Sequence, residues 1–139
     1  MERILVPVDG SKPSERAVRH VIRLSVAGMA LHVVLLNVQE EWAPSRSRAE
    51  EEEGKRLHAQ AAARATRRAR ALLKAAGIPF EGRMLVGPAA PRIVRLARDK
   101  RCSHIVMGMR GIGAVARMVI GSVSMKVVQL ADVPVTLVK

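Results

Sequence analysis

The residues best placed to do chemistry are the glycines Gly108, Gly111, Gly113 and Gly121. The first follows a short apolar run, 104–107, that is typical of a buried strand. Gly121 precedes a helical pattern. Glycines allow the backbone to turn with positive φ and let a ligand approach bare N–H groups. The start of a helix adds unpaired donors and the positive end of its dipole. The spacing therefore predicts a phosphate-binding loop, with Arg110 inside it as a candidate phosphate partner.

The loop differs from the best-known phosphate-binding patterns. No Gly-Lys-Ser/Thr follows, so it is not a P-loop. Gly108, Gly111 and Gly113 give the reverse of the Gly-x-Gly-x-x-Gly spacing. A loop that needs glycine only for turning remains the alternative to a ligand site.

Length and composition indicate one globular domain spanning 1–139. Of the 139 residues, 49% are hydrophobic, which is enough for a real core and argues against disorder. No apolar run approaches the roughly 20 residues of a membrane span. Cys102 is the only cysteine, which excludes an internal disulfide. The chain starts directly with a strand pattern and no signal-peptide layout, so we expect a cytoplasmic protein with no membrane partner.

The net charge of +12 leaves a nucleic-acid-binding module open as an alternative function. Trp42 and Phe80 are the only aromatic residues, so stacking on single-stranded bases has almost no platform. The basic run 64–74 ends a predicted long helix that begins with the acidic run 50–53. This order complements the helix dipole and favours a solvated helix face over a site for an anionic partner.

Hydrophobic periodicity predicts strands that alternate with helices. The expected strands are 3–8, 31–38, 80–86, 104–107 and 133–138, and the expected helices are 11–27, 48–76, 91–100 and 122–131. The long helix has a predicted buried stripe of small and apolar residues at steps of three or four: Leu57, Ala61, Ala65, Ala69, Leu72 and Ala76.

This alternation predicts an α/β fold, a single-domain open five-stranded parallel sheet with helices on both faces. Ligands of such sheets bind outside the carboxyl ends of the strands, where the strand order reverses. If the first strand lies beside the fourth, the turn 7–10 and the glycine loop converge on one site.

The chain resembles the universal stress protein family over nearly its whole length. Four stretches carry the resemblance: 4–11 (Ile-Leu-Val-Pro-Val-Asp-Gly-Ser), Asn37-Val38, 105–111 with Gly121-Ser122-Val123-Ser124, and Val133-Pro134-Val135. The resemblance implies a Rossmann-like fold of the adenine nucleotide alpha hydrolase type. The complete glycine spacing is similar to that of the ATP-binding subgroup.

The resemblance also implies residue roles around ATP, or another adenine nucleotide, bound with Mg²⁺. Asp9 would approach the ribose or a metal-linked phosphate. Pro7, Val8 and Val38 would contact the adenine, and Met107 would line the pocket. The phosphates would meet backbone N–H groups at the glycines and at Val123, and the hydroxyls of Ser122 and Ser124. Met109 is a departure, because many relatives have serine there.

No catalytic constellation accompanies the glycine loop, so we interpret the chain as a nucleotide-dependent stress-response switch or sensor. Slow ATP hydrolysis is the most that phosphate positioning alone would support. A dimeric interaction protein without a nucleotide is the alternative from another class. The terminal strand 133–138 is apolar and is expected at a sheet edge, which predicts a homodimer with Val135 and Leu137 buried across its seam.

Overall fold

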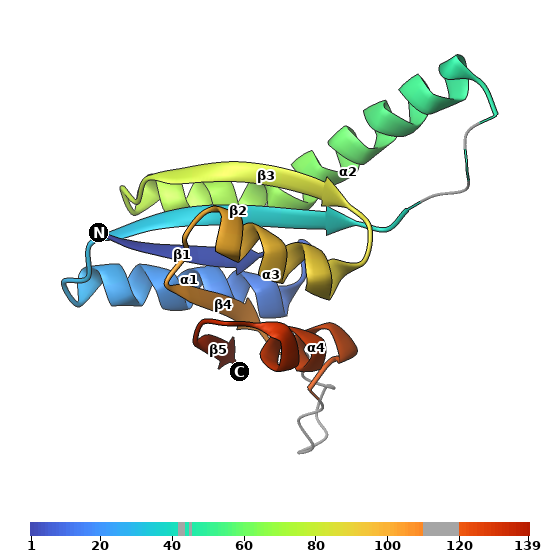
Figure 1. Cartoon of the computed structure of the whole chain (residues 1–139). Coiled ribbons are helices and arrows are strands. Elements are labelled where there is room, and N and C mark those ends of the chain that lie inside the picture. The colour runs from blue at the N-terminus through green and yellow to red at the C-terminus, as the bar shows by residue number, and fades with distance from the viewer. Residues whose placement is uncertain (42–43, 45, 110–119) are drawn as a thin grey trace, which may run out of the picture.

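Five parallel strands form one sheet in the order β3-β2-β1-β4-β5 (Figure 1). The computed structural model describes residues 1–41, 44, 46–109 and 120–139. The strands are β1 (Glu2–Pro7), β2 (Leu31–Gln39), β3 (Phe80–Val86), β4 (His104–Gly108) and β5 (Val135–Val138). The predicted fold class is confirmed, and β1 does lie beside β4.

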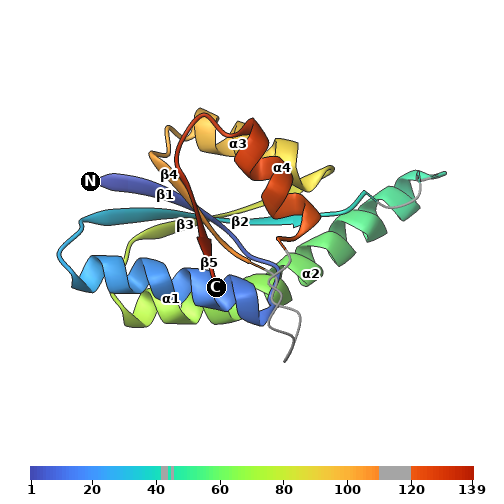
Figure 2. The ribbon, with the colours of Figure 1, turned by 90° about the horizontal axis from the view of Figure 1, so that it is seen from below.

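Helices cover both faces of the sheet (Figure 2). On one face lie α1 (Lys12–Val26) and α2 (Arg48–Ala75), and on the other lie α3 (Ala89–Asp99) and α4 (Ser122–Leu130). No helix in the described part of the chain is long and apolar enough to cross a membrane.

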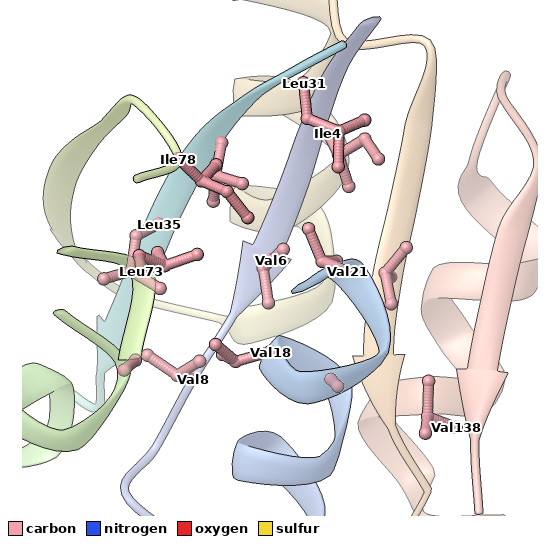
Figure 3. Packing of buried hydrophobic residues seen from close by; sticks show 14 residues of the cluster. Ile4, Val6, Val8, Val18, Val21, Leu31, Leu35, Leu73, Ile78 and Val138 are labelled. Carbon is pink, nitrogen blue, oxygen red and sulfur yellow. The ribbon is translucent and has the colours of Figure 1, made fainter. Parts of the chain in front are cut away.

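The central strand β1 supplies both halves of the core. Ile4 and Val6 point toward α1 and α2, whereas Leu5 points toward α3. All three are at most 1% exposed, because helices cover both faces of a parallel sheet. Figure 3 shows the cluster on the α1 and α2 side, where Val18, Val21 and other apolar side chains meet β1 and β2.

The stripe predicted for α2 is confirmed at Ala69, and Leu72 packs partly against the core, but the other buried positions differ. Its buried residues are His58, Ala62, Thr66, Ala69 and Leu73. The prediction followed alanines and leucines by type. The helix instead turns Thr66 inward, where its hydroxyl donates to the Ala62 carbonyl at 2.8 Å and so satisfies itself within the helix. The first turns of α2 extend beyond the sheet (Figure 1).

Prolines set two element boundaries that differ from the prediction. Helix α3 begins at Ala89 rather than at 91, because Pro88 has the extended backbone of an N-cap. Strand β5 begins at Val135 rather than at 133. Pro134 just before it has no N–H to donate, although its carbonyl accepts from Ile105 N at 3.0 Å.

Candidate functional site

A cavity of about 330 Å³ lies at the carboxyl ends of β1, β2 and β4, in the size range of small-molecule sites. From β1 the sheet continues to β2 and β3 on one side and to β4 and β5 on the other. The strand order therefore reverses at β1, and the carboxyl end of β1 and β4 is the switch point of the sheet. The lining residues are Pro7, Val8, Asp9, Ser11, Pro13, Ser14, Val38, Glu40, Ala89, Ile93, Met107, Gly108, Gly121, Ser122, Val123 and Ser124.

Every predicted site residue that the structure describes lines this cavity. They come from four separate parts of the chain, and the fold brings them to one cavity. Arg110, Gly111 and Gly113 lie outside the described residues.

Asp9 stands at the rim, directly after β1. Its Oδ1 accepts from the Ser11 backbone N–H at 2.9 Å, which closes a tight turn before α1. Partial burial alone would raise the pKa of this carboxyl, but hydrogen bonds from Ser11 and Ser14 outweigh it and the pKa is lowered. The side chain is therefore an anion at neutral pH.

The start of α1 forms one wall of the cavity, which the sequence analysis missed. Ser11 is the N-cap, and its Oγ accepts from Ser14 N at 3.4 Å. The buried Ser14 hydroxyl donates to the Ser11 carbonyl at 3.0 Å. The signal was present in sequence, because a capping serine follows Asp9 by two residues. From this serine, the sequence predicted only the start of a helix and not a wall of the cavity.

Asn37, on the neighbouring strand β2, holds the segment between β1 and α1 in place. It is 2% exposed, and its Nδ2 donates to the Val8 carbonyl at 2.8 Å. Its Oδ1 accepts from Gln39 Nε2, so both ends of the amide are satisfied. Because Val8 precedes Asp9 directly, Asn37 helps to hold the aspartate in place.

Helix α4 begins at the cavity with its donors uncapped. Gly121 is its N-cap and offers no side-chain acceptor. The N–H groups of Ser122, Val123 and Ser124 open the helix and have no helical partner of their own. These donors and the helix dipole make the wall suited to an anion.

Gly108 has a packing role as well as a place in the cavity. A Cβ at this position would lie 2.1 Å from the Pro13 carbonyl oxygen and 2.8 Å from Ser14 N. The end of β4 can therefore lie against the first turn of α1 only because residue 108 is glycine. The next residue, Met109, is 8% exposed and its N–H donates to the Val138 carbonyl at 2.8 Å.

No group of three metal-ligating side chains occurs among the residues placed by the structure. Asp9 and Glu40 are the carboxylates that line the cavity. A Mg²⁺ ion here would need most of its oxygen ligands from phosphates and water, which is how Mg²⁺ is commonly held beside nucleotides.

Comparison with known proteins identifies a family. The model of the universal stress protein family matches residues 1–139. A universal stress protein of Methanocaldococcus jannaschii is 28% identical over an alignment that covers 99% of this chain and 82% of that protein.

Two similar solved structures contain adenine nucleotides. A universal stress protein in complex with cAMP is 25% identical, with a TM-score of 0.69 and coverage of 99% of this chain and 97% of that one. An Arabidopsis thaliana protein of the same family, with AMP bound, is 20% identical, with a TM-score of 0.73 and coverage of 100% and 92%.

Proposed function

Because the chain belongs to the universal stress protein family, we propose that it binds ATP with Mg²⁺, or another adenine nucleotide, as a stress-response switch or sensor. The observation that carries this proposal is the cavity at the switch point. It joins a carboxylate, Asp9, to the uncapped start of α4. The adenine nucleotides bound by two structural relatives support it.

Different parts of the cavity lining suit the base, the ribose and the phosphates of a nucleotide. Val8, Val38 and Met107 form an apolar side for a purine ring. Asp9 can accept hydrogen bonds from ribose hydroxyls or approach Mg²⁺ on a phosphate. The N–H groups of Ser122–Ser124 and the serine hydroxyls donate to phosphate oxygens. None of these roles involves bond breaking, so we infer a binding protein with slow hydrolysis at most.

Replacing Gly121 by valine is expected to weaken nucleotide binding by about tenfold or more, since a branched side chain would fill the mouth of the cavity. The backbone at Gly121 has φ −61° and ψ 156°, which valine adopts without strain. The binding of AMP, cAMP and ATP with and without Mg²⁺ would be measured by calorimetry. The urea-unfolding midpoint serves as the control for an intact fold. Equal affinity in parent and variant would contradict the site.

We also propose a homodimer formed at the β5 edge. Val135 and Leu137 pack partly against the core on the α3 side and keep part of their surface exposed, so the seam expected from the sequence stays a prediction. The exposed apolar surface beside this edge lies on α4, where Met125, Val128 and Leu130 are 47%, 50% and 49% exposed. An apolar helix face next to an unpaired strand edge favours association.

The double substitution Met125→Lys/Val128→Lys is expected to raise the dimer dissociation constant at least tenfold, because each lysine would bury a charge in an apolar interface. Both side chains are exposed, so the fold of one subunit is kept. Val26→Lys is a matched control, because Val26 is 84% exposed on α1. Sedimentation at micromolar concentration measures the change. A parent that is monomeric, or a dimer that both lysines leave intact, would refute this interface.

A further inference from the structure

A second hollow, of about 600 Å³, lies between the later turns of α2 and the edge strand β3. We call it the basic groove. It shares no lining residue with the cavity at the switch point. Its lining residues are Ala59, Ala62, Ala63, Thr66, Arg67, Arg70, Ala71, Lys74, Gly82, Arg83 and Met84. None of them is a carboxylate or an aromatic residue.

Two uncharged groups hold Arg70 in this groove. Its Nε donates to the Thr66 hydroxyl at 3.0 Å, and its guanidinium lies 5.9 Å from the centre of the Phe80 ring. Gly82 leaves the necessary space, because a Cβ there would be 2.2 Å from Arg70 Nη2. Both contacts are with uncharged groups, and Arg70 forms no ion pair with the residues that the structure describes, so the arginine is positioned while its charge stays available to an anion.

Two further cations of α2 share the groove with Arg70. Arg67 and Lys74 form no ion pair within the described residues. By contrast, the neighbouring Arg68 pairs with Glu15 at 2.8 Å. Residues 67, 70 and 74 are three and four positions apart, so they form one row about 10 Å long on the helix.

The opposite wall, formed by β3, adds no carboxylate to the groove. Arg83 on β3 pairs with Glu81 at 3.2 Å, but Glu81 also pairs with Arg3 at 3.0 Å and with Lys100 at 3.2 Å. One carboxylate thus faces three cations. Glu81 and Arg83 flank Gly82 and lie on the α3 face of the sheet, as their β2 partners Val34 and Leu36 do. The positive charge of the groove therefore comes from the cations of α2, beside the alanines of the same helix.

The charge and the lining of the basic groove indicate which class of molecule it binds. A second copy of this chain is a poor occupant of this groove, because a row of cations needs an acidic partner surface and the chain has 12 acidic against 24 basic residues. A polymer with dense negative charge gains from counterion release when it meets a row of cations. The alanine floor is apolar and shallow and suits sugar faces between phosphates. Without aromatic lining, the groove has no means of stacking on bases.

We propose that the basic groove binds the sugar-phosphate backbone of duplex nucleic acid, without reading its sequence. Arg67, Arg70 and Lys74 contact consecutive phosphates of one strand. This is a binding function separate from the nucleotide site. The groove contains three of the five cations of the basic run 64–74, which the sequence pattern favoured as a solvated helix face.

The first test measures how duplex DNA binding depends on salt. A fluorescent 20-base-pair duplex is titrated with the parent, with Arg67→Gln/Arg70→Gln/Lys74→Gln, and with the control Arg23→Gln/Arg48→Gln/Arg95→Gln, which removes equal charge elsewhere. Each lost phosphate contact reduces the slope of log K against log salt by about 0.9. The groove variant is therefore expected to lose about 2 to 3 from the slope and at least tenfold in affinity. The control should stay within about threefold of the parent, because distant charges act only through screened long-range attraction.

A second test moves Arg70 without changing any charge. Gly82→Ala forces the flexible end of the Arg70 side chain to shift, and is expected to weaken DNA binding about threefold at constant net charge. Arg67→Gln/Lys74→Gln changes exposed side chains with no described partner, so a folded variant is available even if the triple variant is unstable.

The outcomes separate the proposal from its rivals. A parent that does not bind the duplex at 50 mM salt overturns it, as do groove and control variants that weaken alike. Polyglutamate that displaces the duplex as well as inorganic polyphosphate does, at equal charge, would assign the groove to an acidic protein instead. AMP affinity should be the same in the parent and the groove variant, because the two sites share no residue.

Discussion

Gly108→Ala is expected to lower the free energy of unfolding by about 3 kcal/mol, the upper range for forcing extra atoms into a packed interior. The added Cβ would meet the backbone of Pro13, at 2.1 Å from its oxygen and 2.2 Å from its carbonyl carbon. Backbone atoms cannot rotate away as a side chain can, so α1 must move relative to β4. Urea unfolding followed by circular dichroism measures the loss.

Gly54→Ala is the matched control for this change. Gly54 lies inside α2, and a Cβ there would meet nothing within 4 Å. Alanine in a helix interior is favoured over glycine by about 0.5–1 kcal/mol, so this variant should be slightly more stable than the parent. If Gly108→Ala unfolds at the same urea concentration as the parent, the close approach of β4 to α1 is wrong.

The second large effect is expected at Asp9. Asp9→Asn keeps an oxygen that accepts from Ser11 N, as Oδ1 does at 2.9 Å, but it removes the negative charge. We expect unfolding stability within about 0.5 kcal/mol of the parent, in the range of surface substitutions. Affinity for ATP with Mg²⁺ should fall by about 10- to 100-fold, the range for losing a hydrogen bond or ion contact to a charged group.

Comparing ligands assigns the contact that Asp9 makes. If the carboxylate acts through Mg²⁺, ATP with the metal weakens and AMP does not. If it binds the ribose, both weaken alike. Asp9→Ala removes the turn contact as well and should also cost stability. Unchanged affinity for both ligands in Asp9→Asn would reduce this residue to a structural role in the turn.

The pKa of Asp9 predicts how the stability difference between the parent and Asp9→Asn depends on pH. Its pKa is lowered in the folded protein, so the carboxylate stabilises the fold above its unfolded pKa. This contribution is lost as the pH falls through the folded value. The stability difference between the parent and Asp9→Asn should therefore shrink in acid and be constant around neutral pH.

Local patterns in the sequence determined the elements and the class of fold. Apolar runs such as 4–6 and 33–36 are uninterrupted because both sheet faces are covered, and this predicts a parallel sheet with helices on each side. Glycines, prolines and capping serines marked the turns. The same turns contain the residues that line the cavity, since ligands of such sheets bind where strands end. The fold and the place of the cavity were therefore predictable from short-range chemistry, whereas the family resemblance supplied most of the individual lining residues and Ser11, Pro13 and Ser14 of the α1 wall were missed.

Only the tertiary structure decided how these elements meet. The buried stripe of α2 passes through Thr66 because its hydroxyl donates to the Ala62 carbonyl, which periodicity alone does not reveal. The close packing of Gly108 on Pro13 and the hydrogen bond from Asn37 to Val8 join residues 95 and 29 positions apart in sequence. Arg70, too, is placed by Gly82 across the edge of the sheet. Such contacts depend on distances between elements, and a one-dimensional pattern carries no information about those distances.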